Sequence, residues 1–411
     1  MLKLFKMYKF WGLSMNIFKQ IKFLILVLIL ALLPGCSWSM DKTATKYYDF
    51  PKPTGKYAVG TRLLELTDPS RNDLETSKPR ELVVQVWYPS EQPSIQSMTP
   101  YAYESLAEFK KDEEAETIEK LDSIRTHGIF DASPVAGKYP VVIFGHGFGM
   151  SRGSYSFFCE NIASHGYVVV MVMHTFVTEL TKFADGREFG LTRKRNFAVF
   201  DECFKDIEFM LDKVISGALG PLTAVCDFTN IGIIGHSLGG VMASHVCRGD
   251  ARVKAGISLD GPLFGINGTK PFNKPFLFVL RSNFYEYFNR FSKDENEYSL
   301  DAAFEEPKTF VGSNERFCKA NGQGAMQIVV RGAEHNTFSD LPILVGMFKE
   351  MFGQELNLSN LETGNVSADA LSTIQGCIIT FFNKNLKNQP DAYPSLVKHD
   401  EGAEDFTFYI H

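Results

Sequence analysis

The feature that most limits the possible folds of this 411-residue chain is a series of short, uninterrupted apolar segments that end in small or polar residues. They are Tyr139–Gly149, Tyr167–His174, Asn230–Ser237, Val253–Asp260, Pro275–Ser282 and Ala325–His335. Strands that are apolar on both faces are typical of parallel sheets covered by helices on each side. Segments of helical character, including Asn196–Ser216 and Leu238–Arg248, separate them. The alternation predicts an α/β fold with an open, mostly parallel, doubly wound sheet, whose ligand site lies at the carboxyl ends of the strands.

Two further elements are predicted upstream of the apolar series. Glu81–Ser90 alternates between apolar and polar residues and predicts a strand that stops near Pro89. Ser105–Ile124 has the charge pattern of an amphipathic helix.

The first 36 residues differ in composition from the rest of the chain. Five lysines and no acidic residue accompany an apolar run, Phe23–Leu33, which is too short for a comfortable membrane span. This pattern predicts a secretory signal peptide. Leu33–Cys36 is similar to a bacterial lipoprotein cleavage box in which Cys36 carries the lipid, although Pro34 replaces the usual small residue. A plain secretory signal is the alternative, and a start at Met15 would give a more ordinary signal length.

Charge and cysteine spacing argue against several classes of function. The formal net charge is −6, and it becomes −11 without the five lysines of the leader. An acidic body argues against nucleic-acid binding and against electrostatic docking on anionic lipid. The cysteines beyond Cys36 show no C-x-x-C spacing and no zinc-ligand pattern. We therefore predict no metal and no cofactor, and buried free thiols, although an exported compartment would permit a disulfide.

The segment Gly235-His236-Ser237-Leu238-Gly239 matches G-x-S-x-G directly between an apolar strand and a helix. Glycine on either side allows the strand and the helix to approach each other at a sharp turn that exposes the serine. The start of the following helix directs N–H groups towards developing negative charge. Ser237 is therefore predicted as a nucleophile, with an ordinary strand–helix corner as the alternative.

A serine nucleophile needs a base and an orienting acid. His335 follows an apolar strand and lies after the serine in the chain, as the order of partners in this architecture requires. Asp260 ends the strand after the nucleophile helix, where a carboxylate can hold the imidazole in one tautomer. Asp250 and Asp340 are its rivals, and Asp340 is expected to cap the helix that follows it. Five other histidines are less suitable as the base. His165 and His245 fall within predicted helices, and His399 and His411 lie in a polar tail. His174 ends a strand but precedes the serine.

The stretch "FGHGFGMS" supplies a glycine-rich loop after an apolar strand. Backbone N–H groups in such a loop can form an oxyanion hole with the residue after the nucleophile. Phe148 and Leu238 are the predicted pair of donors. Tight packing is the alternative role of the loop glycines, most of all for Gly145.

Four stretches placed in this way resemble the platelet-activating factor acetylhydrolase family: the strands around "GKYAVGTRLLELTD" and "LVVQVWYPS", the oxyanion loop region "YPVVIFGHGFGMSRGSYSFFCENIASHGYVVVMVMH", the segments "GHSLGG" and "GISLDGPLFG", and the segments "KPFLFVLRSNFYEYF" and "GAEHNTFSDLPIL". The resemblance covers most of residues 55–390. It implies an α/β-hydrolase fold and calcium-independent removal of short or oxidised acyl groups from the second carbon of glycerophospholipids. It supports Ser237, Asp260 and His335 as a triad and Phe148 and Leu238 as oxyanion donors.

Two departures from the family bear on the choice of substrate. Thr175 stands where the family tends to have arginine followed by aspartate, and the stretch between Arg281 and Gln327 is longer than the family's. A general carboxylesterase or polyester/dienelactone-type hydrolase is therefore the alternative enzyme. A lipid-binding lipoprotein without catalysis is the alternative of a different class.

The predicted organisation is a signal peptide at 1–36, a linker at 37–55, an α/β-hydrolase catalytic domain at 56–390 and a carboxyl-terminal tail at 391–411. We expect an exported lipoprotein held at a membrane through Cys36, in the outer membrane or periplasm, or alternatively a secreted protein. Its expected partner is a phospholipid or another ester substrate.

Overall fold

The computed structural model describes residues 46–91, 98–101, 115–192, 197–262, 273–282, 325–352, 362–390 and 406–410. The strands are β1 (Tyr48–Asp49), β2 (Ala58–Asn72), β3 (Pro79–Ser90), β4 (Met98–Pro100), β5 (Ile124–Phe130), β6 (Tyr139–Gly145), β7 (Val168–Met173), β8 (Leu180–Lys182), β9 (Glu188–Gly190), β10 (Cys226–His236), β11 (Val253–Leu259), β12 (Phe276–Arg281), β13 (Ala325–Val330) and β14 (Phe406–Ile410). The α-helices are α3 (Ala115–Asp122), α4 (Ser156–Ser164), α5 (Phe197–Ile215), α6 (Leu238–Gly249), α9 (Leu341–Phe352) and α10 (Ala368–Lys387).

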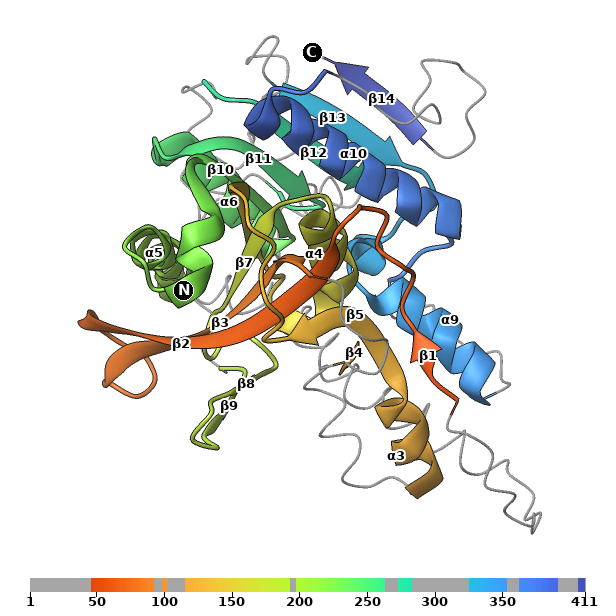
Figure 1. Ribbon diagram of the computed structural model, residues 1–411, viewed down its shortest axis with the longest axis horizontal. Coiled ribbons are helices and arrows are strands. Elements are labelled where there is room, and N and C mark those ends of the chain that lie inside the picture. Colours follow the sequence, from red (N-terminus) through yellow and green to blue (C-terminus); the bar gives the residue numbers. More distant parts are fainter. Residues whose placement is uncertain are drawn as a thin grey trace, which may run out of the picture.

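One large sheet runs through the molecule (Figure 1). Its order is β1-β5-β2-β3-β7-β6-β10-β11-β12-β13-β14, with β4 paired to β5 beside this path. All pairs from β7 through β13 are parallel, whereas β2, β3 and β7 pair antiparallel. This confirms the predicted open, mostly parallel sheet.

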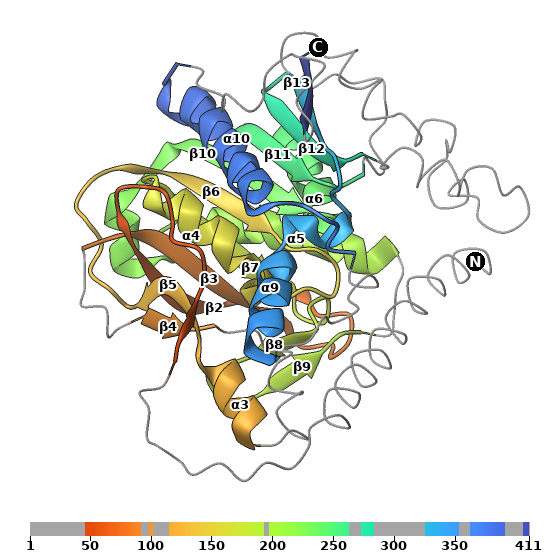
Figure 2. The same ribbon diagram turned by 90° about the vertical axis from the view of Figure 1, so that its right-hand side faces the viewer.

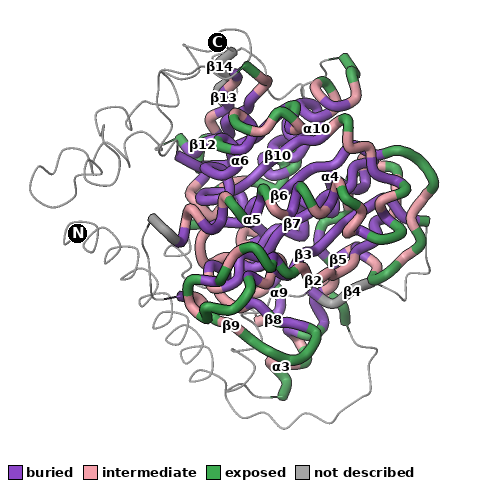
Figure 3. The backbone as a smooth tube through the Cα atoms, turned by 90° about the vertical axis from the view of Figure 1, so that its left-hand side faces the viewer, coloured by how far each residue is buried: buried purple, intermediate pink, exposed green. Residues whose placement is uncertain are grey.

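Helices cover both faces of this sheet, as the apolar strands require. Every residue of β6 and β7 is buried. On one face the core is completed by α4, α9 and α10, and on the other by α5 and α6 (Figure 2). Figure 3 shows the same arrangement as buried central strands with exposed residues in the outer turns. The predicted helices Asn196–Ser216 and Leu238–Arg248 are confirmed as α5 and α6.

The sheet order places the candidate site at a specific point. From β6 the chain passes through α4 to β7 on one side, and it then returns through α5 to β10 on the other side of β6. The strand order therefore reverses between β6 and β10. Crevices for ligands in open α/β sheets form at the carboxyl ends of strands where the order reverses. The loop after Gly145 and the turn at Ser237 both begin there.

Three predicted boundaries differ from the structure. Ile124, predicted as the end of a helix, begins strand β5, and the described helix α3 ends at Asp122. Part of the predicted linker forms β1, which pairs with β5 and leads to the buried Phe50. Part of the predicted tail forms β14, which pairs antiparallel with β13. These segments are too short or too polar to be identified before their partner strands are known.

The predicted signal peptide and Cys36 lie outside the described residues. Within the described ranges, none of the helices combines the length and the apolar character needed to cross a bilayer.

Candidate active site

Ser237 occupies a sharp turn between β10 and α6. Its backbone angles are φ 54° and ψ −117°, a region that residues with a side chain rarely adopt. Glycines make the turn possible, because a Cβ atom on Gly239 would lie 2.0 Å from the carbonyl oxygen of Gly145. A Cβ atom on Gly235 would likewise lie 2.2 Å from the carbonyl oxygen of Gly239. The strand and the helix are thus in backbone contact, and Gly145 has the packing role that was the alternative for it.

The structure brings Ser237, His335 and Asp260 together. The Oγ atom of Ser237 lies 2.9 Å from Nε2 of His335, and Nδ1 of the same ring lies 2.7 Å from Oδ2 of Asp260. Asp260 follows β11, and His335 begins a 3₁₀ turn shortly after β13. The three side chains come from the carboxyl ends of three different strands, as predicted.

Asp260 is held as an ionised acceptor. Burial alone would raise its pKa, but the hydrogen bond from His335 and the charge of Arg281 outweigh this effect and keep the pKa below its ordinary value. The backbone N–H of Arg281 donates to the second carboxylate oxygen at 3.1 Å, and its Nε atom lies 3.4 Å from Oδ2. A carboxylate in this position favours the tautomer of His335 that carries hydrogen on Nδ1.

Phe148 and Leu238, the predicted oxyanion donors, lie after neighbouring strands. Phe148 is in the loop after β6, and Leu238 is the first residue of α6 after β10. Gly145, the last residue of β6, is paired with Gly235, the penultimate residue of β10. The loop is fixed because Gly149, at φ 74°, donates its N–H to the carbonyl oxygen of Val177 at 2.9 Å.

The rival acids have other partners. Asp250 directly follows α6 and forms an ion pair with Arg252. Asp340 is completely buried, and its carboxylate accepts the N–H of Phe157 at 3.2 Å, in the first turn of α4. The expectation that this side chain caps the helix following it was therefore wrong, because the helix it caps precedes it by almost two hundred positions in the chain.

The other histidines that lie within the described residues are engaged elsewhere. Nε2 of His165 lies 2.8 Å from Oγ1 of Thr54. The ring of His245 packs against Phe204 at 4.5 Å between centroids. His174 is fully buried and its Nδ1 lies 3.0 Å from Oδ2 of Asp206. His399 and His411 lie outside the described residues.

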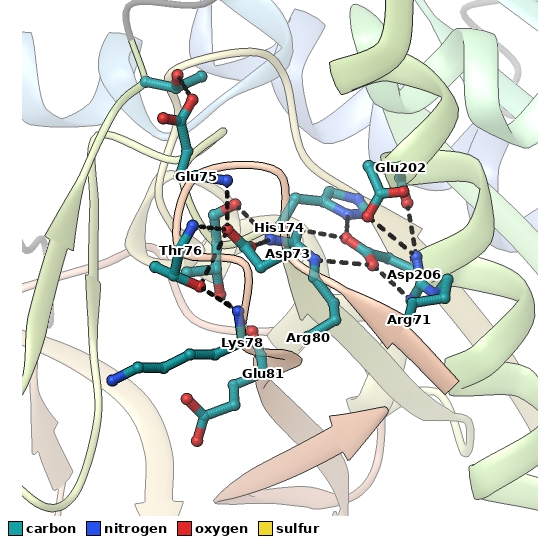
Figure 4. A network of polar contacts seen from close by, with 12 residues as sticks. Arg71, Asp73, Glu75, Thr76, Lys78, Arg80, Glu81, His174, Glu202 and Asp206 are labelled. Carbon is teal, nitrogen blue, oxygen red and sulfur yellow. Dashed lines mark hydrogen bonds and ion pairs between the residues drawn. The ribbon is translucent and has the colours of Figure 1, made fainter. Parts of the chain in front are cut away.

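A buried network of charged side chains around His174 was not predicted (Figure 4). The guanidinium of Arg80 bonds to Asp206 and Asp73, and it also donates to the carbonyl oxygen of Thr175 at 3.0 Å. Burial would raise the pKa of Asp206, but the charge of Arg80 and the hydrogen bond from His174 lower it instead. The only hint in the sequence was charge at the ends of two strands and on the inner face of α5.

This network connects to the glycine-rich loop after β6 through His174. The backbone N–H of His174 donates to Nε2 of His146 at 3.2 Å, and Nδ1 of His146 donates to the carbonyl oxygen of Gly147 at 2.8 Å. Burial lowers the pKa of His146 to about 3, so this ring is neutral and can accept and donate at once. The segment that follows β7 therefore supports the loop that carries Phe148.

Within the described ranges, no group of three or more His, Cys, Asp or Glu side chains is arranged to hold a metal ion. The described cysteines are free and buried, namely Cys159, Cys203, Cys226, Cys247 and Cys377.

Comparison with known proteins agrees with this geometry. A family model described as platelet-activating factor acetylhydrolase, isoform II, matches residues 42–178 and 203–402, which include all three members of the array. The chain belongs to this family. A second family model, chlorophyllase, matches residues 111–272.

Individual relatives of this acetylhydrolase family member are distant. A probable 1-alkyl-2-acetylglycerophosphocholine esterase of Arthroderma benhamiae is 24% identical over 74% of this chain and 80% of its own. The platelet-activating factor acetylhydrolase of Cavia porcellus is 26% identical over 64% of this chain and 62% of its own, so the chain spans less than two thirds of that relative.

A solved structure extends the likeness to other esterases. The ferulic acid esterase from Streptomyces cinnamoneus has a TM-score of 0.66 and 29% sequence identity, covering 88% of this chain and 98% of its own. The mixed, mostly parallel sheet and this likeness establish an α/β-hydrolase fold. Together with the family match, they identify the protein as a carboxylic ester hydrolase.

Proposed function

We propose that the protein hydrolyses the sn-2 short-chain or oxidised acyl group of phospholipids such as platelet-activating factor, through an acyl-serine intermediate. The observation that carries this proposal is the array of Ser237, His335 and Asp260, joined by hydrogen bonds of 2.9 Å and 2.7 Å in a member of the acetylhydrolase family. No step of the proposed reaction requires calcium.

Acylation begins when Nε2 of His335 accepts the hydroxyl proton of Ser237, and Oγ attacks the ester carbonyl carbon. The imidazolium that forms is stabilised by the ionised Asp260, which stays unprotonated because its pKa is lowered. The proton then passes from His335 to the leaving alcohol, which for a phospholipid is the lysophospholipid. The acyl group remains on Oγ.

The tetrahedral oxyanion would be bound by the backbone N–H groups of Phe148 and Leu238. The start of α6 adds the positive end of a helix dipole at Leu238. A donor of this kind contributes about 3 kcal/mol to transition-state stabilisation, since the charge it binds develops only there.

Deacylation repeats the sequence with water. His335 takes a proton from water, the hydroxide attacks the acyl carbon, and the tetrahedral intermediate collapses with release of the fatty acid. The proton returns through His335 to Oγ of Ser237, which restores the starting state.

The choice of phospholipid rests on two relatives, which are named as a probable 1-alkyl-2-acetylglycerophosphocholine esterase and a platelet-activating factor acetylhydrolase. A general carboxylesterase is the second candidate, and the likeness to a ferulic acid esterase at 29% identity favours it.

Rates on three substrates distinguish these candidates: a glycerophosphocholine with an acetyl group at the second carbon, p-nitrophenyl acetate and methyl ferulate. The phospholipase proposal expects kcat/KM to be highest for the acetylated phospholipid with calcium chelated. Turnover of only the simple or aromatic esters would identify the carboxylesterase instead. Failure of a fluorophosphonate probe to label the wild type would favour the lipid-binding protein without catalysis.

We further propose that the enzyme is exported and held at a membrane by a lipid on Cys36. A lipid anchor contributes about 0.8 kcal/mol per buried CH₂ group and would keep the site near its substrate. Detergent phase partitioning of the wild type and of Cys36→Ser, expressed in a bacterium with a lipoprotein pathway, tests this. The anchored form should enter the detergent phase and the variant should not, whereas equal partitioning would support a plain secretory signal.

A further inference from the structure

Two buried side chains, Tyr155 and His236, connect the three parts of the candidate site. The backbone N–H of Gly147, next to Phe148, donates to Oη of Tyr155 at 2.9 Å. The same hydroxyl lies 2.8 Å from Nδ1 of His236, the residue that immediately precedes Ser237. The other ring nitrogen of His236, Nε2, lies 2.8 Å from the carbonyl oxygen of His335.

The direction of each hydrogen bond in this chain follows from the chemistry of its ends. The N–H of Gly147 can only donate, and the carbonyl oxygen of His335 can only accept. A neutral His236 must therefore carry its hydrogen on Nε2, which leaves Nδ1 as an acceptor for the hydroxyl of Tyr155. These hydrogen bonds thus have one consistent set of directions, from the oxyanion loop through Tyr155 and His236 to His335.

The surroundings keep His236 neutral. Tyr155 is fully buried and His236 is 1% exposed. Burial and the neighbouring His335 lower the pKa of His236 to about 3. The two histidine rings lie 4.7 Å apart between centroids, so a charge on His236 would repel the imidazolium that His335 forms during the reaction.

The space around the chain is equally restricted. A Cβ atom on Gly147 would lie 3.0 Å from Oη of Tyr155 and 3.1 Å from Nδ1 of His236. The ring of Tyr155 packs against Phe144 at 5.0 Å between centroids, which fixes the hydroxyl below the loop. A methyl group at Gly147 would therefore crowd both side chains where the loop crosses over them.

We propose that Tyr155 and His236 are positioning residues that set the oxyanion loop, the nucleophile turn and His335 at their working distances. This inference rests on the proposed function. Neither side chain has to touch the substrate. Tyr155 acts through the backbone of Gly147, next to Phe148, and His236 acts through the backbone of His335. A displacement of about 1 Å among reacting groups can lower a rate about 100-fold, so a short link of this kind affects turnover more than folding.

The test compares Tyr155→Phe with Tyr167→Phe. Tyr167 is also fully buried, and its hydroxyl donates to Oδ1 of Asn383 at 2.7 Å. It immediately precedes β7, at the opposite end of the parallel strands from the site residues. Both variants therefore lose one buried, hydrogen-bonded tyrosine hydroxyl. A fall in Tm is expected for both, measured by thermal unfolding.

Activity should separate the two tyrosine variants. With p-nitrophenyl acetate, Tyr155→Phe should lower kcat about 10- to 100-fold and change KM by no more than about 2-fold, because it misplaces groups used in the transition state. Tyr167→Phe should leave kcat within about 2-fold of the wild type. Equal kcat values in the two variants would overturn the proposal.

A second pair examines His236. His236→Gln retains an N–H for the carbonyl of His335 but places no acceptor at Nδ1, and His245→Gln is the control at a histidine of α6. We expect His236→Gln to lose kcat and His245→Gln to keep it. The fold loss of kcat in the double variant Tyr155→Phe/His236→Gln should be smaller than the product of the two single losses, since both changes interrupt the same series of hydrogen bonds. Losses of kcat that simply multiply in the double variant, or equal kcat in the two glutamine variants, would contradict the positioning proposal. If Tyr155→Phe does not fold, the comparison of His236→Gln with His245→Gln decides alone.

Ser237→Ala in the same assay distinguishes failure of the proposed function from failure of the positioning proposal. Activity retained by Ser237→Ala would mean that the proposed function has failed. An inactive Ser237→Ala together with a Tyr155→Phe variant that keeps the wild-type kcat would mean that only the positioning proposal is wrong.

Discussion

His335 and Asp260 are joined by a hydrogen bond of 2.7 Å between Nδ1 and Oδ2, although 75 positions in the chain separate them. This bond determines which ring nitrogen of His335 is available to Ser237. With hydrogen on Nδ1, the Nε2 atom is an acceptor, and it lies 2.9 Å from the serine hydroxyl. The acid therefore acts through the tautomer and orientation of the imidazole.

Asp260→Asn should lower kcat about 10⁴-fold, because an amide in this position favours the wrong tautomer of the histidine. Steady-state kinetics with p-nitrophenyl acetate measure this effect. Asp250→Asn is the matched control, since Asp250 pairs with Arg252 at the end of α6. A loss of similar size in both variants, or none in Asp260→Asn, would contradict the assignment.

Gly239→Ala should lower kcat at least about 100-fold and also lower Tm, because the new methyl group would meet the carbonyl oxygen of Gly145 at 2.0 Å and push the nucleophile turn away from the loop. Gly249 ends the same helix, and nothing lies within 4 Å of a Cβ atom there. Gly249→Ala should therefore change stability by no more than about 1 kcal/mol and leave kcat intact. Equal changes in kcat and Tm in the two variants would contradict the close backbone contact between the nucleophile turn and Gly145.

The sequence predicted the serine, histidine and aspartate because each lies at the end of a continuous apolar strand or shortly after it. Parallel strands bring their carboxyl ends to one edge, so a local signal was sufficient to place residues far apart in the chain. Ser237 was also marked by its glycines, which report the backbone contact with Gly145.

The supporting contacts could not be predicted in the same way. Arg80 and Asp206 are 126 positions apart, and their pairing depends on how α5 packs against the start of β3. Nothing local in the sequence distinguishes Tyr155 from other core tyrosines, and His236 is a variable position of the serine motif. Strands β1 and β14 acquire their structure from partners that only the assembled sheet provides.

Arg80→Met should lower the free energy of unfolding by about 3–5 kcal/mol, because Asp73 would remain buried without its cation and Asp206 would retain only Arg71. Arg62→Met is the control. Arg62 pairs with Asp131, whose side chain is 60% exposed, and loss of such a pair costs no more than about 1 kcal/mol. Urea unfolding of both variants measures the difference, and equal shifts would show that the buried network adds little.

Glu160 should give stability an unusual pH dependence. Burial raises its pKa to about 7 from an ordinary value of 4.5, against the opposing hydrogen bonds from the N–H groups of His127 and Gly128. Between these two pH values the folded state binds a proton that the unfolded state does not, so this contribution to stability is lost as the pH rises.

Glu160→Gln is neutral at every pH and removes this effect. The free energy of unfolding of the wild type minus that of the variant should fall by about 3 kcal/mol between pH 4.5 and pH 7.5. Urea unfolding at the two pH values gives this difference directly. A difference that stays constant, or increases with pH, would show that Glu160 is ionised throughout.

The most direct test of the central claim is hydrolysis of an sn-2 acetyl phospholipid by the wild type and by Ser237→Ala, with calcium chelated. We predict release of acetate by the wild type and a loss of at least about 10⁴-fold in the variant, because the hydroxyl that accepts the acyl group is gone. Equal rates for the two proteins, or a wild-type rate that requires calcium, would contradict the assignment of Ser237 as the nucleophile of a calcium-independent phospholipid esterase.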